Sequence, residues 1–176
     1  MILGIDISTA ITAFTLLDDD GKIVICQALR LEKFKDIFSK ADYIKKFVEN
    51  LRKEYKNDIN NVYIEEPLMS FQAGMSSAKT IATLMRFNGI VSWICSDILD
   101  ITPQFISAAT ARKSYGVKPV KGTKTKEIVF KAVLDKESDF KVEYTAHGNP
   151  IPGSMDRSDS FIIAKAGYSL WKSLKN

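Results

Sequence analysis

The stretch ILGIDIS at residues 2–8 decides the fold, because it places the acid Asp6 inside an otherwise apolar strand. A carboxylate in such a position costs several kcal/mol, to order of magnitude, unless it is paired or binds a metal. A second apolar run follows at 11–17, and the turn signal Asp18-Asp19-Asp20-Gly21 leads to a third strand at 22–26. Strands joined so closely predict an antiparallel meander.

The pattern then changes to helical spacing, because apolar residues recur every three or four positions between Phe34 and Tyr55. This predicted helix leads to a short buried strand at 62–64, and Pro67 stops that strand. A helix that connects two strands favours a parallel pairing with the meander. A second helix at 76–99 is apolar on more than one face, so it lies in the core or meets another subunit.

The remaining segments complete an α/β pattern. We expect a final strand at 100–102, ended by Pro103, then a helix at 124–134, a loop at 138–155 and a last helix at 156–174. This order of elements predicts one α/β domain over residues 1–176, with a mixed five-stranded sheet flanked by helices.

Composition narrows the class of protein. Hydrophobic residues make up 45% and charged residues 26% of the 176 residues, which is ordinary for a soluble globular protein. No stretch approaches the length of a membrane span, and the start lacks the basic region of a signal peptide. Cys26, Cys95 and the sole histidine, His147, do not make a zinc set, and the cysteines are expected to be free thiols. Any metal should therefore be a hard ion held by oxygen.

The basic residues are unevenly distributed along the chain. The stretch 112–126 contains no acid, which suits a polyanion such as a nucleic-acid backbone, although a solvated basic loop has the same composition. Its six basic residues are Arg112, Lys113, Lys118, Lys121, Lys124 and Lys126.

Three further acids are the expected companions of Asp6. Glu65 ends the strand at 62–64, and Asp156 and Asp159 are three residues apart, so they share one face of the last helix. If the two strands are neighbours, all four carboxylates converge at one edge of the sheet. Such a cluster suits Mg²⁺, and two ions roughly 4 Å apart can activate water and stabilise a leaving oxygen. Alternatively, Asp156 only caps the last helix and Asp159 only interacts with its positive N-terminal dipole, and either Glu65 or Glu66 is an exposed acid.

Three motifs in this order resemble the RuvC family of Holliday junction resolvases over the whole length of the chain. They are Gly4-Ile5-Asp6-Ile7-Ser8, Tyr63-Ile64-Glu65-Glu66 and Asp156-Arg157-Ser158-Asp159-Ser160-Phe161-Ile162-Ile163-Ala164. The resemblance implies an RNase H-like fold, a homodimer and hydrolysis of branched DNA with Mg²⁺, for which Mn²⁺ can substitute. It also implies that the metal-binding acids are Asp6, Glu65, Asp156 and Asp159.

Two further segments are similar to functional stretches of that family. Residues 122–126 match the stretch that carries an active-site lysine, with Lys126 as the better positional match and Lys124 as the alternative. A lysine there neutralises charge that builds on the phosphate, or only contacts a phosphate during binding. The family's aromatic wedge falls at Leu68 here, which leaves Phe71 as the candidate for base stacking.

The motifs also depart from the family pattern without losing a carboxylate. Ile7-Ser8 stands where the family has Pro-Gly, and residues 156–160 differ from the usual Asp-Ala-Ala-Asp-Ala. The divergent motifs suit a phage or viral member of the family.

The resemblance and the residues together predict a crossover junction endodeoxyribonuclease of DNA recombination and repair. It is expected to act on four-way junctions, and on other branched DNA, in the cytoplasm of a bacterium or of a phage-infected host. Two alternatives stay open: an RNase H-like nuclease that cuts flaps or RNA–DNA hybrids, and a junction-binding protein without activity. Clustered acids argue against the second, because phosphate binding gains nothing from negative charge.

Overall fold

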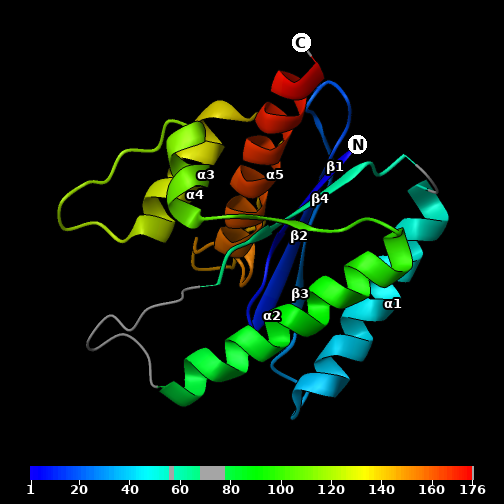
Figure 1. Cartoon of the computed structure of the whole chain (residues 1–176). Coiled ribbons are helices and arrows are strands. Elements are labelled where there is room, and N and C mark those ends of the chain that lie inside the picture. The colour runs from blue at the N-terminus through cyan, green and yellow to red at the C-terminus, as the bar shows by residue number, and fades with distance from the viewer. Residues whose placement is uncertain (56–57, 68–77, 176) are drawn as a thin grey trace.

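The computed structural model describes residues 1–55, 58–67 and 78–175. Its centre is a mixed five-stranded sheet with the strand order β3-β2-β1-β4-β5 (Figure 1). The strands are β1 (Ile2–Asp6), β2 (Ile11–Leu17), β3 (Ile23–Arg30), β4 (Asn61–Glu65) and β5 (Gln104–Ile106). The helices are α1 (Ile37–Tyr55), α2 (Ala78–Leu99), α3 (Ala108–Ser114), α4 (Thr125–Lys136) and α5 (Ser154–Lys175). The predicted α/β architecture is confirmed.

Strand pairing follows the sequence pattern closely. The first three strands form an antiparallel meander, in which β2 pairs with both β1 and β3. On the other side of β1, β4 pairs in parallel, with Ile5 opposite Ile64. The parallel pairing was predicted from the helix that connects the meander to β4, because a crossover of this length returns the chain in the same direction.

Helices cover both faces of the sheet, so the molecule has two cores (Figure 1). Helices α1 and α2 pack on one face, against Leu3 and Ile5 of β1. Helix α5 crosses the other face, with α3 and α4 packed against it, and contacts Ile2 of β1 and Tyr63 of β4. Because side chains alternate along a strand, Gly4 and Asp6 share the α5 face with Ile2.

Close contact between α5 and the sheet depends on two glycines. A Cβ added at Gly4 would lie 2.4 Å from the backbone nitrogen of Ala164 in α5, and one added at Gly167 would lie 2.2 Å from the ring of Tyr63. Thr15 of β2 and Ser160 of α5 share a buried hydrogen bond of 2.8 Å between their hydroxyl groups. These contacts hold the first turns of α5 beside the end of β1.

One predicted strand is wrong. Residues 100–102 do not form a strand, and β5 lies instead on the far side of Pro103, where Gln104 pairs with Tyr63. The positive φ of 57° at Asp100 turns the chain out of α2 before it can join the sheet. Pro103 has no N–H group to donate to a ladder, so it precedes the paired residues of this edge strand and does not end them.

Other boundaries differ by a few residues from those expected. Strand β3 continues to Arg30, well past the predicted end at residue 26, because β2 offers partners as far as Ile11. Helix α5 begins at Ser154, so Asp156 lies within its first turn and not at its N-cap. Helix α3 was not predicted as a separate element. It begins after Ser107, whose hydroxyl oxygen accepts a hydrogen bond from the backbone N–H of Thr110.

Both cysteines, Cys26 and Cys95, are free thiols, as expected. Across the part of the chain that the structure describes, no helix is long and apolar enough to cross a membrane.

Candidate active site

Asp6 and Glu65 lie side by side at one edge of the sheet. Asp6 is the last residue of β1 and Glu65 the last residue of β4, and the two strands are parallel neighbours. Only 8% of Asp6 is exposed. Tyr63 of β4 contacts Gly167 of α5, so by alternation Glu65 points to the α5 face as well, whereas Glu66 is exposed. The structure therefore brings Glu65, and not Glu66, to the carboxylate of Asp6.

Helix α5 carries the second pair of acids. Asp156 lies in its first turn and Asp159 follows on the same face, and their side chains are only 16% and 14% exposed. Both are thus largely withdrawn from water although they carry charge. The position of α5 against Gly4 brings this face beside the end of β1.

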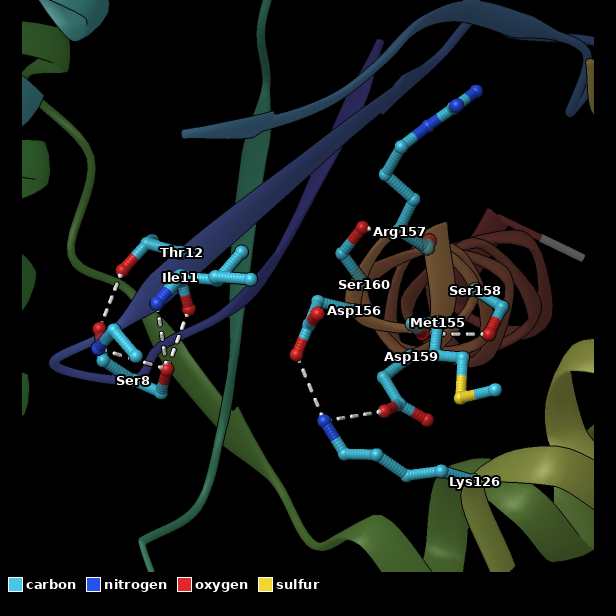
Figure 2. Close-up of polar contacts among 11 residues, drawn as sticks. Ser8, Ile11, Thr12, Lys126, Met155, Asp156, Arg157, Ser158, Asp159 and Ser160 are labelled. Atoms are coloured by element: carbon cyan, nitrogen blue, oxygen red, sulfur yellow. Dashed lines mark hydrogen bonds and ion pairs between the residues drawn. The ribbon is translucent and has the colours of Figure 1, made fainter. Parts of the chain in front are cut away.

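Lys126, in the first turn of α4, connects the two acids of α5. Its Nζ lies 2.8 Å from Oδ1 of Asp156 and 3.3 Å from Oδ2 of Asp159. Figure 2 shows the lysine side chain reaching from α4 to a point between the two carboxylates. Lys124, the alternative from the sequence, is the exposed N-cap residue of α4, and its side chain makes no capping hydrogen bond.

Three of the acids, Asp6, Glu65 and Asp159, line a small cavity of about 130 Å³ together with Lys126. The guanidinium-bearing Arg112 of α3 also lines this cavity, and so does Thr125. The sequence had assigned Arg112 only to the DNA backbone. Its spacing from the acids in the sequence carries no signal of this contact, which arises because α3 packs against α5. The complete lining is Asp6, Glu65, Ala108, Arg112, Thr125, Lys126, Asp159, Ile162 and Ile163.

The acids strongly perturb one another. Burial and the charges of Glu65 and Asp159 raise the pKa of Asp6 well above its ordinary value. Burial likewise raises the pKa of Glu65, although a hydrogen bond with Asp6 and the positive charge of Lys126 oppose the shift. For Asp159, burial raises the pKa to about 6, against the opposing charge of Lys126. The ionised forms of Asp6 and Glu65 are therefore both disfavoured when no cation lies beside them.

Lys126 responds in the opposite direction. Burial lowers the pKa of its ammonium group, but the carboxylates of Asp6, Asp156 and Asp159 more than offset that effect and raise the pKa above its ordinary value. The lysine is therefore charged throughout the physiological range and compensates part of the negative charge.

The donor set fits a hard divalent cation. The four side chains supply only carboxylate oxygens, which Mg²⁺ prefers, and the ammonium group of Lys126 lies between two of them. In the described ranges, no three side chains of ligating type lie close enough together to hold an ion. The acids instead form two pairs: Asp6 and Glu65 end neighbouring strands, and Lys126 joins Asp156 to Asp159.

A second cavity of about 420 Å³ adjoins the acidic one and shares Arg112 and Thr125 with it. Basic Lys113 and Lys118 line it, as do apolar residues that include Val117 and Ile128. Lys121 and Lys124 are exposed on the same connection between α3 and α4. Part of the predicted basic stretch therefore lines a cavity that adjoins the acidic one. Phe71, the predicted base-stacking residue, lies outside the described residues.

No protein-family model matches the sequence, and no curated protein matches it significantly. Solved structures do match. RuvC of T. thermophilus, in complex with a Holliday junction substrate, superposes with a TM-score of 0.65 at 11% identity, over 97% of this chain and 94% of that chain. A second Thermus thermophilus RuvC structure gives a TM-score of 0.62 at 12% identity, over 98% and 96%. The yeast mitochondrial Holliday junction resolvase Ydc2 gives 0.59 at 15% identity, over 99% and 80%. The chain therefore has the RNase H-like α/β fold that RuvC and Ydc2 share.

Proposed function

We propose that this chain is a metal-dependent, structure-selective DNA endonuclease that resolves four-way junctions by phosphodiester hydrolysis. One observation carries the proposal: four carboxylates and a lysine from four separate elements meet beside a basic surface, at one edge of the sheet. The fold supports it, because RuvC, solved in complex with a Holliday junction, shares the architecture over nearly the whole chain.

In this proposal the acids Asp6, Glu65, Asp156 and Asp159 hold Mg²⁺, and Mn²⁺ can replace it. When bound, the metal lowers the pKa of a coordinated water and stabilises charge on the phosphate oxygens. The buried position of the acids orients their oxygens and excludes bulk water from around them. Lys126 supplies positive charge where the phosphate becomes more negative, because its Nζ already lies within this group of carboxylates.

The basic surface is proposed to bind the DNA backbone next to the cut. Arg112 lines both cavities, so a strand held along Lys113 and Lys118 would enter the acidic cavity at Arg112. Backbone contacts of this kind position the duplex and carry no sequence information themselves.

We also propose that the chain works as a homodimer, with α2 at the interface. The outer face of α2 exposes 63% of Trp93 and 41% of Met85, next to Phe38 of α1, which is 68% exposed. Phe38 and Trp93 line one shallow apolar groove. A four-way junction must be cut on two strands, and a second copy supplies the second site. Apolar residues gathered on one surface are typical of a protein interface.

The test is cleavage of a synthetic four-way junction in Mg²⁺, with product lengths mapped on all four strands. We expect paired cuts near the branch point. A flap and an RNA–DNA hybrid of matched length are the comparison substrates. If either is cut faster than the junction, that nucleic acid and not the four-way junction is the preferred substrate. Tight junction binding without cutting in Mg²⁺ or Mn²⁺ would identify a binding protein and contradict the proposal.

A further inference from the structure

The ammonium group of Lys126 occupies the place between Asp156 and Asp159 where a cation is expected (Figure 2). Its Nζ lies 2.8 Å from one carboxylate and 3.3 Å from the other, which are ordinary ion-pair distances. Two of the four acids are already engaged with the lysine.

Lys126 is the partner that can move. Its side chain is 55% exposed and extends from the first turn of α4. Asp156 and Asp159, at 16% and 14% exposure, are fixed on α5, which is attached to the sheet by the buried hydrogen bond of Ser160. A lysine has a flexible four-carbon side chain that can move into solvent, whereas the short aspartate side chains stay close to α5.

We propose that Lys126 is an internal counter-ion, which a divalent cation must displace from Asp156 and Asp159 before the metal site can form. Once displaced, the ammonium group is free to contact a phosphate oxygen of the DNA. Metal loading and release of the lysine are then one coupled step. The inference rests on the proposed metal-dependent function, and it adds a competition within the chain that limits metal affinity in the absence of DNA.

The first test measures Mn²⁺ binding to the full-length protein without DNA, by electron paramagnetic resonance. In Lys126→Met the competitor is removed, so we expect Mn²⁺ to bind about tenfold more tightly than to the wild type. Lys126→Arg keeps a competing cation and should bind Mn²⁺ with nearly wild-type affinity. Lys131→Met is the matched control, because it removes the same charge from an exposed position on the same helix and should change affinity little.

A second test keeps the wild-type side chain and so does not depend on a variant that folds. Acetylation of Lys126 by acetic anhydride is followed by mass spectrometry, with and without Mg²⁺. Release from two carboxylates leaves the amino group open to the reagent, so Mg²⁺ should speed acetylation of Lys126 several-fold relative to Lys131.

The outcomes separate this inference from the proposed function. Equal Mn²⁺ affinity in the wild type and Lys126→Met, or an acetylation rate that Mg²⁺ leaves unchanged, would overturn the displacement even if junctions are cut. If Mg²⁺ displaces Lys126 but junctions are not cut, the counter-ion role is supported and the proposed junction cleavage is contradicted. Absence of Mn²⁺ binding in every variant would overturn both.

Discussion

Asp6 is a buried acid next to another acid, and its position makes a clear prediction for Asp6→Asn. Loss of this ligand should lower the rate of junction cleavage by at least about 100-fold. Mutation of a residue that only hydrogen-bonds to a metal ligand typically lowers activity by less than that. Junction binding should persist, because the basic surface is untouched. The metal-free variant should also unfold at a higher temperature, since burial and neighbouring acids disfavour the ionised Asp6.

Cleavage, binding and thermal melting in a metal chelator check the three parts of this prediction. Glu66→Gln is the control, because this exposed acid does not line the cavity. An Asp6→Asn protein that cuts at the wild-type rate would exclude the metal mechanism.

Asp159 makes the stability of the metal-free protein depend on pH. Its pKa is about 6 in the fold and 3.8 ordinarily, so the folded state binds more protons than the unfolded state between these values. The contribution of Asp159 to the free energy of unfolding therefore falls as pH rises from about 4 to about 6, by up to about 3 kcal/mol. The Asp159→Asn variant has no ionisable group at this position, so its free energy of unfolding lacks this fall with pH. The free energy of unfolding of the variant minus that of the wild type should increase over this range and then level off.

Urea denaturation in a chelator at a series of pH values measures this difference. A difference that stays flat from pH 4 to pH 7 would show that the carboxyl group of Asp159 is not perturbed in the fold. Saturating Mg²⁺ should raise the stability of the wild type more than that of Asp159→Asn.

At the scale of elements, the seating of α5 on the sheet makes a prediction for the two contact glycines. Gly4→Ala places a methyl group against the backbone of Ala164, and Gly167→Ala places one against the ring of Tyr63. Both variants should lose roughly 1–3 kcal/mol of unfolding free energy, as overpacked cores do. The Gly167 clash is with a side chain alone, so Tyr63→Leu should partly relieve Gly167→Ala. The Gly4 clash includes backbone atoms of Ala164 as well as its Cβ, so Ala164→Gly should not fully relieve Gly4→Ala.

Double-mutant cycles by urea denaturation measure the two couplings. Full rescue of Gly4→Ala by Ala164→Gly would mean that the methyl of Ala164, and not the backbone of α5, makes the contact. Because Gly4 is two residues from Asp6 on the same face of β1, a shift of α5 here should lower cleavage along with stability.

The connection between α3 and α4 makes a prediction for DNA binding. The double variant Lys113→Ala/Lys118→Ala removes two exposed charges from the rim of the larger cavity but none from the acids. It should weaken binding to junctions and reduce the dependence of log affinity on log salt by about 1–2 units, because fewer counterions are released. The cleavage rate of fully bound junctions should stay near that of the wild type.

Salt titrations of junction binding, together with single-turnover cleavage at saturating protein, separate the two effects. The pair Lys45→Ala/Lys46→Ala is a charge-matched control on α1, which covers the opposite face of the sheet. An unchanged salt dependence in the Lys113→Ala/Lys118→Ala protein would remove this surface from the proposed DNA path.

At the scale of the whole molecule, the exposed face of α2 makes a prediction for assembly. Trp93→Glu puts a charge at the centre of the apolar groove and should convert the proposed dimer into a monomer at micromolar concentration. Multi-angle light scattering measures the mass. Leu174→Glu, at an 85% exposed position near the end of α5, is the control and should remain a dimer. A monomeric wild type would contradict the proposed interface.

Much of the fold could be predicted from the sequence because its signals are local. Apolar runs over residues 2–26 predict the strands of the meander and helical spacing over 34–55 predicts a helix, and both predictions are confirmed. The strand near residue 100 was misplaced because it is short and lies at the sheet edge. Its position depends on pairing with β4 and on the turn at Asp100, neither of which has a local signal.

The sequence by itself determined the order of elements from β1 to α2, the acids Asp6, Asp156 and Asp159, and the basic character of residues 112–126. Only the tertiary structure decided which of Glu65 and Glu66 lies beside Asp6, and which of Lys124 and Lys126 reaches the acids of α5. It also brought Arg112 into the acidic cavity. The physical reason is distance along the chain. Periodicity indicates on which face of its own element a residue lies. Packing between residues that are far apart in sequence brings five elements together at one edge of the sheet: β1, β4, α3, α4 and α5.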